Sequence, residues 1–291
     1  MLLQRILTAL VLAAVAISAI FMLPTLYFYL FIAVIVLIAA WEWATLTAMQ
    51  KTSTKVLFLI SLVLPMLGIT FWTQILEVLA LVLEWPEIKE YSGILEWLVI
   101  GPVIFWVMMM FLIRKTPEAL LALEIKGKFK AFIGWFVLFS AWMFLVKLRA
   151  FYGSEAVMYF LALIWIADIS AYFSGKKFGK DKLAPVISPG KTVQGMYGAF
   201  ISSMICAVIL ALYYDYPFMI ATDFGMLSIL TVLVSIYGDL FFSLVKRKSG
   251  AKDSGSILPG HGGVLDRIDS VIAAAPFYYA GVVLIGRSVF S

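Results

Sequence analysis

Apolar stretches of about 20 residues recur along the whole chain, the length that an α-helix needs to cross the roughly 30 Å core of a bilayer. The segment 73–85 is also apolar but contains Glu77 and Glu84, so it either extends the third helix or lies at the membrane interface. The chain is therefore expected to be an all-α polytopic integral membrane protein. The pattern predicts nine transmembrane helices, at residues 6–23, 26–48, 56–72, 94–113, 131–149, 156–173, 193–213, 222–245 and 269–289.

The first 24 residues combine a positive charge with an apolar run, as a signal peptide does. The run from Ile6 to Leu23 is long enough to span a bilayer, and further spans follow it. We therefore expect this segment to be retained as the first transmembrane helix. The single cysteine, Cys206, lies within a predicted helix and cannot form an intrachain disulfide.

Composition and charge agree with this class and add an orientation. Of the 291 residues, 64% are apolar and 13% are charged, whereas soluble domains are about 25% charged. If the predicted helices alternate in direction, 18 of the 22 lysines and arginines lie on the side of the N-terminus. Cytoplasmic loops carry such an excess of positive charge, so the N-terminus is expected in the cytoplasm. The opposite side holds Lys89, Lys147, Arg149 and Arg287.

Polar chemistry is concentrated in the second half of the chain. Residues 1–130 are apolar and poor in motifs, while the polar segments crowd into 165–270. We see no internal repeat and no low-complexity tract. The chain is expected to form one integral domain, with residues 1–130 as scaffold helices and residues 131–291 carrying the functional site.

Carboxylates at membrane depth are energetically costly and usually functional. Glu42 lies between two tryptophans near the end of the second predicted helix and is interpreted as a structural hydrogen-bonding or interface residue. Asp239, Ser243 and Arg247 follow i, i+4, i+8 spacing, so they share one helix face that leads from the membrane into a basic loop. The alternative for Asp239 is a structural ion pair with a lysine or arginine. The four carboxylates of this kind are Glu42, Asp168, Asp239 and Asp269.

The segment 252–270, KDSGSILPGHGGVLDRIDS, gathers three of the 17 acidic residues and the only histidine, His261. Its glycines allow backbone N–H groups to approach a phosphate, although a tight turn before a helix would use them equally well. A magnesium ion takes one or two carboxylates and completes its shell with phosphate oxygens, and the lack of a His/Cys cluster excludes zinc. The flanking charged residues are Lys246, Arg247, Lys248, Lys252, Asp266, Arg267 and Asp269.

A second basic segment, residues 174–192, is predicted on the same side of the membrane. Its end, SPGKT, precedes a predicted helix, where Lys191 and Thr192 can hold an anion or where Ser188 or Thr192 simply caps the helix. Lysines at this membrane face also bind anionic lipid head groups, which describes Lys248 best. For His261, the roles of base, phosphate donor and structural hydrogen bonder all stay open.

Residues 243–269 contain the motif S-L-V-K-R, then K-D-S-G, then L-P-G-H-G-G-V-L-D-R-I-D. This pattern closely resembles the signature of the phosphatidate cytidylyltransferases, also called CDP-diacylglycerol synthases. The segments ADISAYFSGKKFGK and ISPGKTVQG resemble the upstream part of the same family, while residues 1–130 contain no motif that matches. The matching signature positions are Ser243, Lys246, Arg247, Lys252, Asp253, Gly255, Leu258, Pro259, His261, Gly262, Gly263, Asp266, Arg267 and Asp269.

The resemblance implies a nucleotidyltransferase that converts CTP and phosphatidic acid into CDP-diacylglycerol and pyrophosphate, with Mg²⁺ as cofactor and room for a second cation. It also implies a role in phospholipid biosynthesis, a site facing the cytoplasm, a homodimer and, in a bacterium, location in the inner membrane; no nucleic-acid partner is expected. Asp239 and Asp266 are expected to hold the metal. The other expected site residues are Lys246, Arg247, Lys252 and Arg267 for the phosphates, with Ser243, His261, Gly262, Gly263, Lys191, Asp168, Asp269 and Asp253 as further binding candidates.

Two other classes of function stay open at this point. A related CTP-dependent lipid kinase, or a synthase that uses another lipid phosphate, differs from the implied enzyme in its products. An anion transporter would place Asp168 and Asp239 along a translocation path.

Overall fold

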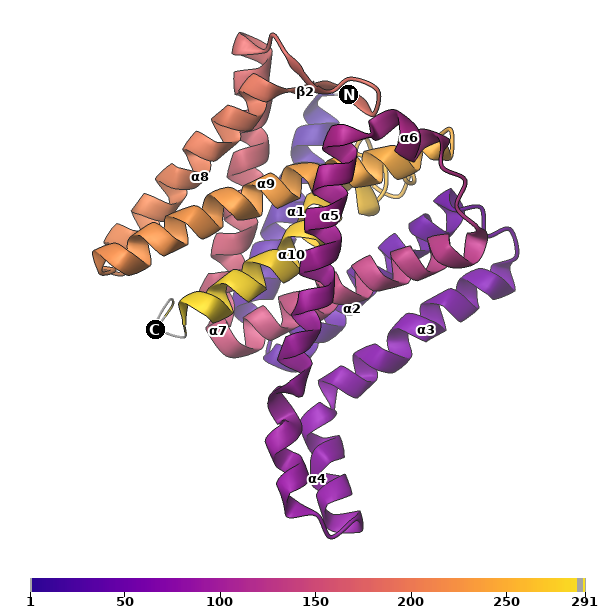
Figure 1. The fold of residues 1–291 in the computed structure, drawn as a ribbon, viewed down its shortest axis with the longest axis vertical. Helices are drawn as coiled ribbons and strands as arrows, with labels where there is room; N and C mark the ends of the chain where they lie inside the picture. The colour runs from indigo at the N-terminus through magenta and orange to yellow at the C-terminus, as the bar shows by residue number, and fades with distance from the viewer. Residues whose placement is uncertain (1, 287–289, 291) are drawn as a thin grey trace.

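The computed structural model describes residues 2–286 and 290, and most of them are helical (Figure 1). The elements are, in order, α1 (Leu2–Met22), α2 (Thr25–Leu46), α3 (Thr52–Thr70), α4 (Trp72–Val82), the 3₁₀ helix η1 (Pro86–Val99), α5 (Ile100–Lys115), α6 (Pro117–Ala122), α7 (Gly127–Phe178), β1 (Lys182–Ala184), β2 (Ser188–Thr192), α8 (Val193–Tyr213), α9 (Phe218–Lys248) and α10 (Leu265–Ile285).

Within the described residues, seven helical segments are long and apolar enough to cross a membrane. They are α2, α3, the continuous segment of η1 and α5, α7, α8, α9 and α10, and two shorter apolar helices, 7–22 and α4, accompany them. The all-α, multi-span architecture expected from the sequence is therefore confirmed. The expected number of nine spans is not confirmed, in part because α7 alone covers two of the predicted helices.

The 52-residue helix α7 is bent at Gly153, whose φ of +82° and ψ of −173° are not helical. Gly153 lies in the gap between the two helices predicted at 131–149 and 156–173. A residue with a β-carbon is strained at this backbone conformation, whereas glycine adopts it readily. The bend allows one continuous segment to pack against α2 before Gly153 and against α8 after it, while α10 contacts both parts.

Helices α7 to α10 pack together and form the part of the molecule that carries the polar segments (Figure 1). The crossing of α9 and α10 is close: a β-carbon added to Gly238 would lie 2.3 Å from the β-carbon of Ala273. Small residues at a helix crossing allow the two backbones to approach each other in this way. As a result, Asp239 on α9 and Asp269 on α10 lie at the same crossing.

The segment 174–192, expected to be a loop, contains a small antiparallel hairpin of β1 and β2. Lys182 pairs with Thr192 and Ala184 pairs with Ser188. The side chain of Thr192 accepts a hydrogen bond of 3.1 Å from the backbone N–H of Gly195, so the expected capping of the following helix is confirmed for Thr192. The hairpin therefore leads directly into the first turn of α8.

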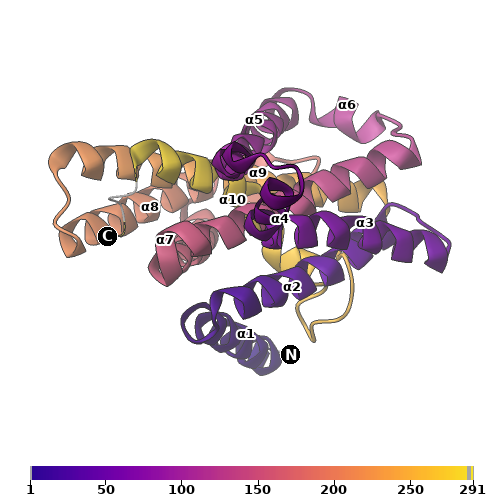
Figure 2. The same ribbon diagram turned by 90° about the horizontal axis from the view of Figure 1, so that it is seen from below.

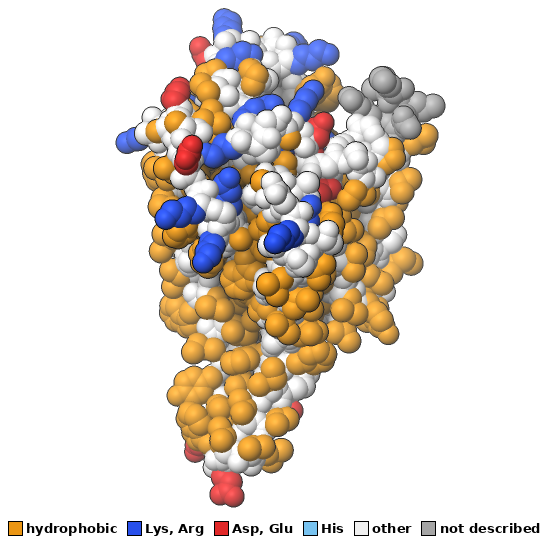
Figure 3. Space-filling model, turned by 90° about the vertical axis from the view of Figure 1, so that its right-hand side faces the viewer, with side chains coloured by type: hydrophobic (Ala, Val, Ile, Leu, Met, Phe, Trp, Pro, Cys, Tyr) orange, Lys and Arg blue, Asp and Glu red, His pale blue; other side chains and the backbone are white. Residues whose placement is uncertain are grey.

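The apolar segment 73–85 forms a separate helix, α4, after a turn at Phe71, so it does not extend α3. Figure 1 shows α4 at one tip of the molecule, apart from α7 to α10. In Figure 3, Lys and Arg side chains gather over the opposite part of the visible face, and acidic side chains mark the tip. The two ends of the protein therefore differ in charge, as the count along the sequence predicted.

Candidate active site

An ion pair joins the hairpin to α9 at the centre of the candidate site. Lys191 Nζ on β2 lies 2.5 Å from Asp239 Oδ2 on α9, and it also donates a hydrogen bond of 3.2 Å to the carbonyl of Ile236. Ser243, one helical turn after Asp239, donates a hydrogen bond of 3.3 Å to Asp239 Oδ1, as their spacing predicted. The side chains of Lys191 and Asp239 are 26% and 30% exposed, so a ligand can reach both.

Two further carboxylates lie near this pair. Asp168, exposed on α7, interacts electrostatically with Lys191 and Asp239. Asp269, buried at the start of α10, interacts electrostatically with Asp239 as well, and its Oδ1 accepts a hydrogen bond of 2.8 Å from the backbone N–H of Ser270. Three helices thus each bring one carboxylate to the surroundings of Lys191. Carboxyl oxygens gathered in this way are the ligands that a hard divalent cation prefers.

A second ion pair closes the segment that connects α9 to α10. Lys246 Nζ lies 2.6 Å from Asp266 Oδ1, and both side chains are largely buried. Asp266 Oδ2 accepts hydrogen bonds from the backbone N–H groups of Ser254, at 2.8 Å, and Gly263, at 3.0 Å. Asp266 therefore holds Ser254 and Gly263, two points of this segment, together while it binds Lys246. The ammonium of Lys246 also interacts electrostatically with Asp239 and Asp269, so the two ion pairs belong to one charged region.

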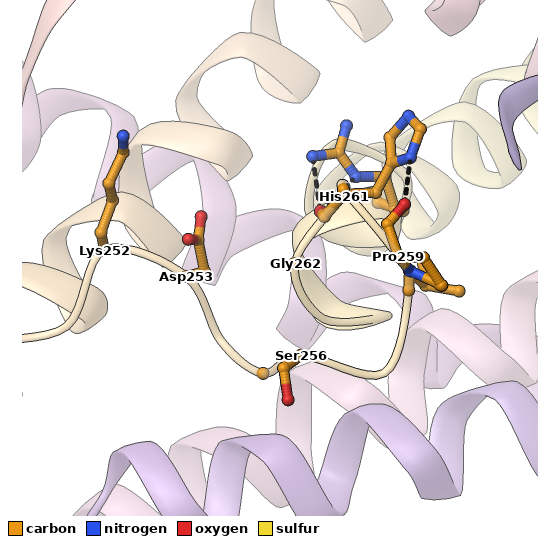
Figure 4. Close-up of a pocket in the computed structure, with 10 residues that line it drawn as sticks. Lys252, Asp253, Ser256, Pro259, His261 and Gly262 are labelled. Carbon is orange, nitrogen blue, oxygen red and sulfur yellow. Dashed lines mark hydrogen bonds between the residues drawn. The ribbon is translucent and has the colours of Figure 1, made fainter. Parts of the chain in front are cut away.

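The segment between these anchors forms the wall of a pocket of about 630 Å³ (Figure 4). In Figure 4, Lys252 and Asp253 lie on one arm of the segment and His261 on the other, all with their side chains pointing upward, whereas the side chain of Ser256 points downward. Arg267 donates two hydrogen bonds to the carbonyl of His261, from Nε at 3.1 Å and from Nη2 at 2.8 Å. The pocket is lined by Lys252, Asp253, Gly255, Ser256, Leu258, Pro259, Gly260, His261, Gly262 and Arg267.

The structure divides the expected site residues into two neighbouring groups. The first surrounds the Lys191–Asp239 pair, and the second lines the pocket, with the Lys246–Asp266 pair between them. Gly262 lines the pocket with a φ of +84°, and Gly263 donates its N–H to Asp266. Arg247 instead contacts the hairpin, because its Nε donates a hydrogen bond of 3.3 Å to the carbonyl of Ile187.

Lys248 takes a role that the sequence did not predict, whereas Glu42 has the structural hydrogen-bonding role expected of it, with partners that the sequence did not identify. Lys248 is held by the carbonyls of Leu120, Leu121 and Leu123, so it ties α9 to the end of α6 rather than facing lipid head groups. Glu42, on α2, accepts hydrogen bonds from the segment between α9 and α10. A carboxylate between two tryptophans was the available signal for Glu42, but its partners lie more than 200 residues away and no local pattern identifies them.

The contacts of Asp239 and Asp266, the expected metal ligands, show which of their oxygens can bind a magnesium ion. Among residues 2–286 and 290, no three His, Cys, Asp or Glu side chains are arranged to hold a metal ion by themselves. A magnesium ion that binds together with substrate phosphates needs only one or two carboxylates. Asp239 Oδ2 and Asp266 Oδ1 meet this requirement, since each faces a lysine ammonium that a cation can replace. Asp266 Oδ2 does not, because it is engaged with two backbone N–H groups.

Comparison with known proteins identifies the group to which this architecture belongs. Residues 3–285 match the model of the cytidylyltransferase family. The phosphatidate cytidylyltransferase of Pseudomonas aeruginosa is 37% identical over 96% of both chains, and that of Haemophilus influenzae is 33% identical over 96% of this chain and 97% of its own. The phosphatidate cytidylyltransferase of Bacillus subtilis is 43% identical over 44% of this chain. With matches that extend over nearly its whole length, the chain belongs to the cytidylyltransferase family.

Proposed function

We propose that this protein is a phosphatidate cytidylyltransferase, which converts CTP and phosphatidic acid into CDP-diacylglycerol and pyrophosphate. The relatives that align with 96% of the chain carry this name, and the fold provides the membrane-embedded helices that a lipid substrate requires. The observation that carries the proposal is the adjacency of two carboxylate–lysine pairs and a pocket lined by basic side chains.

In the proposed reaction, an oxygen of the lipid phosphate attacks the α-phosphorus of CTP. A new P–O bond forms, the bond between the α-phosphorus and the bridging oxygen breaks, and pyrophosphate leaves with that electron pair. The second pKa of a phosphomonoester is about 6, so the attacking phosphate is already largely ionised near neutral pH. The reaction therefore needs no strong general base, and His261 is assigned none; its Nδ1 lies 3.4 Å from the carbonyl of Pro259.

Catalysis then depends on positioning the two phosphates and neutralising their charge. Lys252 and Arg267 line the pocket and are assigned to the polyphosphate of CTP. Lys191 and Lys246 are held beside the site by Asp239 and Asp266 and can turn from these carboxylates to phosphate oxygens. Arg247 is assigned to phosphate binding as well, from its place at the hairpin.

Mg²⁺ is assigned to the oxygens that the lysines would leave, Asp239 Oδ2 and Asp266 Oδ1. When bound, the ion would offset the negative charge of the nucleotide phosphates. Ser243 keeps the orientation of the Asp239 carboxylate through its hydrogen bond. Asp168 and Asp269 are further carboxyl groups near this position and are assigned to the site as candidate oxygen ligands of a second cation.

The test is pyrophosphate release by the purified protein in detergent, with CTP, phosphatidic acid and Mg²⁺, and with each omitted in turn. Release that requires all three, together with a CDP-lipid product, supports the proposal. A phosphorylated lipid and free CDP would instead indicate a CTP-dependent lipid kinase. Turnover of another lipid phosphate in preference to phosphatidic acid would indicate a different CDP-lipid synthase.

We further propose that the site faces the cytoplasm and that the protein forms a homodimer. The excess of lysine and arginine on the side of the N-terminus supports the orientation. The dimer rests on the family resemblance, and light scattering of the detergent-solubilised protein measures it directly.

A further inference from the structure

Glu42 lies at the centre of a hydrogen-bond network that joins α2 to the active-site segment. Its side chain is buried, with 3% of the residue exposed. Oε2 accepts hydrogen bonds of 2.8 Å from both the hydroxyl of Ser254 and the backbone N–H of Leu265, and Oε1 accepts one of 2.9 Å from the N–H of Val264. A single carboxylate from the first half of the chain therefore holds both ends of segment 254–265. Figure 2 shows this segment beside α2.

The surroundings of Glu42 are shaped to receive this carboxylate. A β-carbon at Gly255 would lie 2.7 Å from Glu42 Oε1, and one at Gly263 would lie 2.3 Å from Oε2. Real β-carbons do not come this close to another heavy atom. These two glycines thus leave the space that Glu42 occupies, a role distinct from contact with phosphate.

The network continues into the predicted catalytic residues through Ser254. Its hydroxyl donates to Glu42, and its backbone N–H donates to Asp266 Oδ2. Gly263 likewise donates its N–H to Asp266 while its backbone packs against Glu42. The position of Asp266, and of the Lys246 that it binds, is therefore coupled to Glu42 through two residues.

The N-terminus of α10 explains why a carboxylate suits this position. Val264 and Leu265 carry N–H groups at the start of α10, where the helix has no acceptors of its own for them. The partial positive charge of a helix N-terminus also favours an anionic side chain. Because each oxygen of Glu42 accepts from one backbone N–H, a glutamine in either orientation would place its NH₂ group against an N–H donor.

We infer that Glu42 is a positioning residue of the active site, which fixes segment 254–265 before substrate binds so that Asp266, Lys246 and the pocket residues are already in place for CTP. The inference rests on the proposed function. Without Glu42, CTP binding would have to order the segment, and the free-energy cost of that ordering would weaken the binding of CTP. The predicted loss falls on the KM for CTP more than on kcat.

The first experiment compares Glu42→Gln with the matched control Glu77→Gln, which changes an exposed glutamate on α4. We expect Glu42→Gln to raise the KM for CTP about tenfold, the scale of a lost hydrogen bond to a charged group, while kcat at saturating CTP stays within about threefold. The control should keep both constants. A variant that is merely less folded would lower the apparent kcat through its smaller active fraction and leave KM unchanged, which would overturn the inference.

The second experiment measures amide hydrogen exchange in segment 254–265 without any substrate. Exchange in this segment should accelerate at least about tenfold in Glu42→Gln, while α7 and α8 exchange as in the unchanged protein. This readout does not depend on activity, so it separates failure of the inference from failure of the proposed function. Unchanged exchange in segment 254–265 would contradict the positioning role.

Ser254→Ala provides a test that holds even if Glu42→Gln does not fold. It removes one of the three hydrogen bonds of Glu42 and keeps both backbone bonds. We expect an intermediate effect, about a threefold rise in the KM for CTP with faster exchange in the same segment. A Ser254→Ala protein identical to the unchanged one in both measurements would overturn the inference.

Discussion

The ammonium of Lys191 and the carboxylate of Asp239 lie 2.5 Å apart, although one comes from a β-hairpin and the other from the middle of a transmembrane helix. The pair connects the polar segment 174–192 to the signature segment that follows Asp239. Each member neutralises the other in the absence of substrate, so the site can hold both charges at moderate cost in an apolar protein. Substrate phosphates and a cation would satisfy the same two charges separately.

Asp239→Asn should lower kcat/KM for pyrophosphate release by about 100-fold or more, because an amide neither balances Lys191 nor serves as a strong ligand for a cation. The control is Asp223→Asn, which changes an exposed acid near the other end of α9. Both variants should elute as the unchanged protein does in size-exclusion chromatography. Full activity of a folded Asp239→Asn protein would remove Asp239 from the site.

Two changes at Asp266 should separate its two contacts. In Asp266→Asn, the carbonyl oxygen can keep the N–H groups of Ser254 and Gly263, and the NH₂ group then faces Lys246. We expect at least about 100-fold lower activity, as for loss of a metal ligand. Asp266→Ala loses both contacts and should also unfold earlier, by roughly 3–10 °C, for a loss of about 1–3 kcal/mol. Equal unfolding temperatures for the two variants would contradict this division of roles.

Lys246 and Lys248 are two residues apart, yet the structure gives them different partners. Lys246 binds Asp266, whereas Lys248 binds carbonyls of residues 120–123. Lys246→Met should therefore abolish most of the pyrophosphate release. Lys248→Met should retain activity at 25 °C and lower the unfolding temperature, because it leaves three carbonyls without their shared donor. Loss of catalysis in a stable Lys248→Met protein would show that Lys248 acts on substrate.

How much of this site the sequence predicts depends on how far apart along the chain the contacting residues lie. The i, i+4 relationship of Asp239 and Ser243 is local and is confirmed by their hydrogen bond. The helix predicted at 193–213 has the same bounds as α8, because a polar, capped start and an apolar run define it. The Lys191–Asp239 pair depends instead on how the hairpin folds against a residue of α9 that lies 48 positions later, and no periodic pattern specifies that packing.

Where the predicted elements differ from the structure, the differences have physical causes. The hairpin of β1 and β2 is short, rich in glycine and proline, and held partly by Arg247, so it has the composition of a loop. The count of spans differs because α7 remains helical on both sides of Gly153 and because the first predicted span is described as the shorter apolar helix 7–22. The sequence predicts a structural hydrogen-bonding or interface role for Glu42, but its hydrogen bond with Ser254 depends on the packing of α2 beside the segment that follows α9.

Gly263→Ala should be damaging for a steric reason. The added β-carbon would lie 2.2 Å from the hydroxyl of Ser254 and 2.3 Å from Glu42 Oε2, both in a buried network. We expect about 1–3 kcal/mol of destabilisation, with a higher KM for CTP, as for overpacking in a filled core. Gly68→Ala is the control, because a β-carbon there has nothing within 4 Å. If the Gly263→Ala protein were as stable as Gly68→Ala, the network around Glu42 would rearrange at little cost in stability, and the prediction would be wrong.

The orientation of the protein can be measured with single cysteines in a Cys206→Ser background, since Cys206 is the only native cysteine. Ser256→Cys places a thiol in the exposed pocket segment, and Glu87→Cys places one on η1 near α4. Thr8 donates a hydrogen bond of 3.4 Å to the carbonyl of Pro259, so the start of α1 lies on the same face as this segment. We expect a membrane-impermeant maleimide to label Ser256→Cys only in inside-out vesicles and Glu87→Cys only in right-side-out vesicles. Labelling of Ser256→Cys from the outside would reverse the proposed orientation and place the CTP pocket, together with the N-terminus, away from the cytoplasmic nucleotide pool.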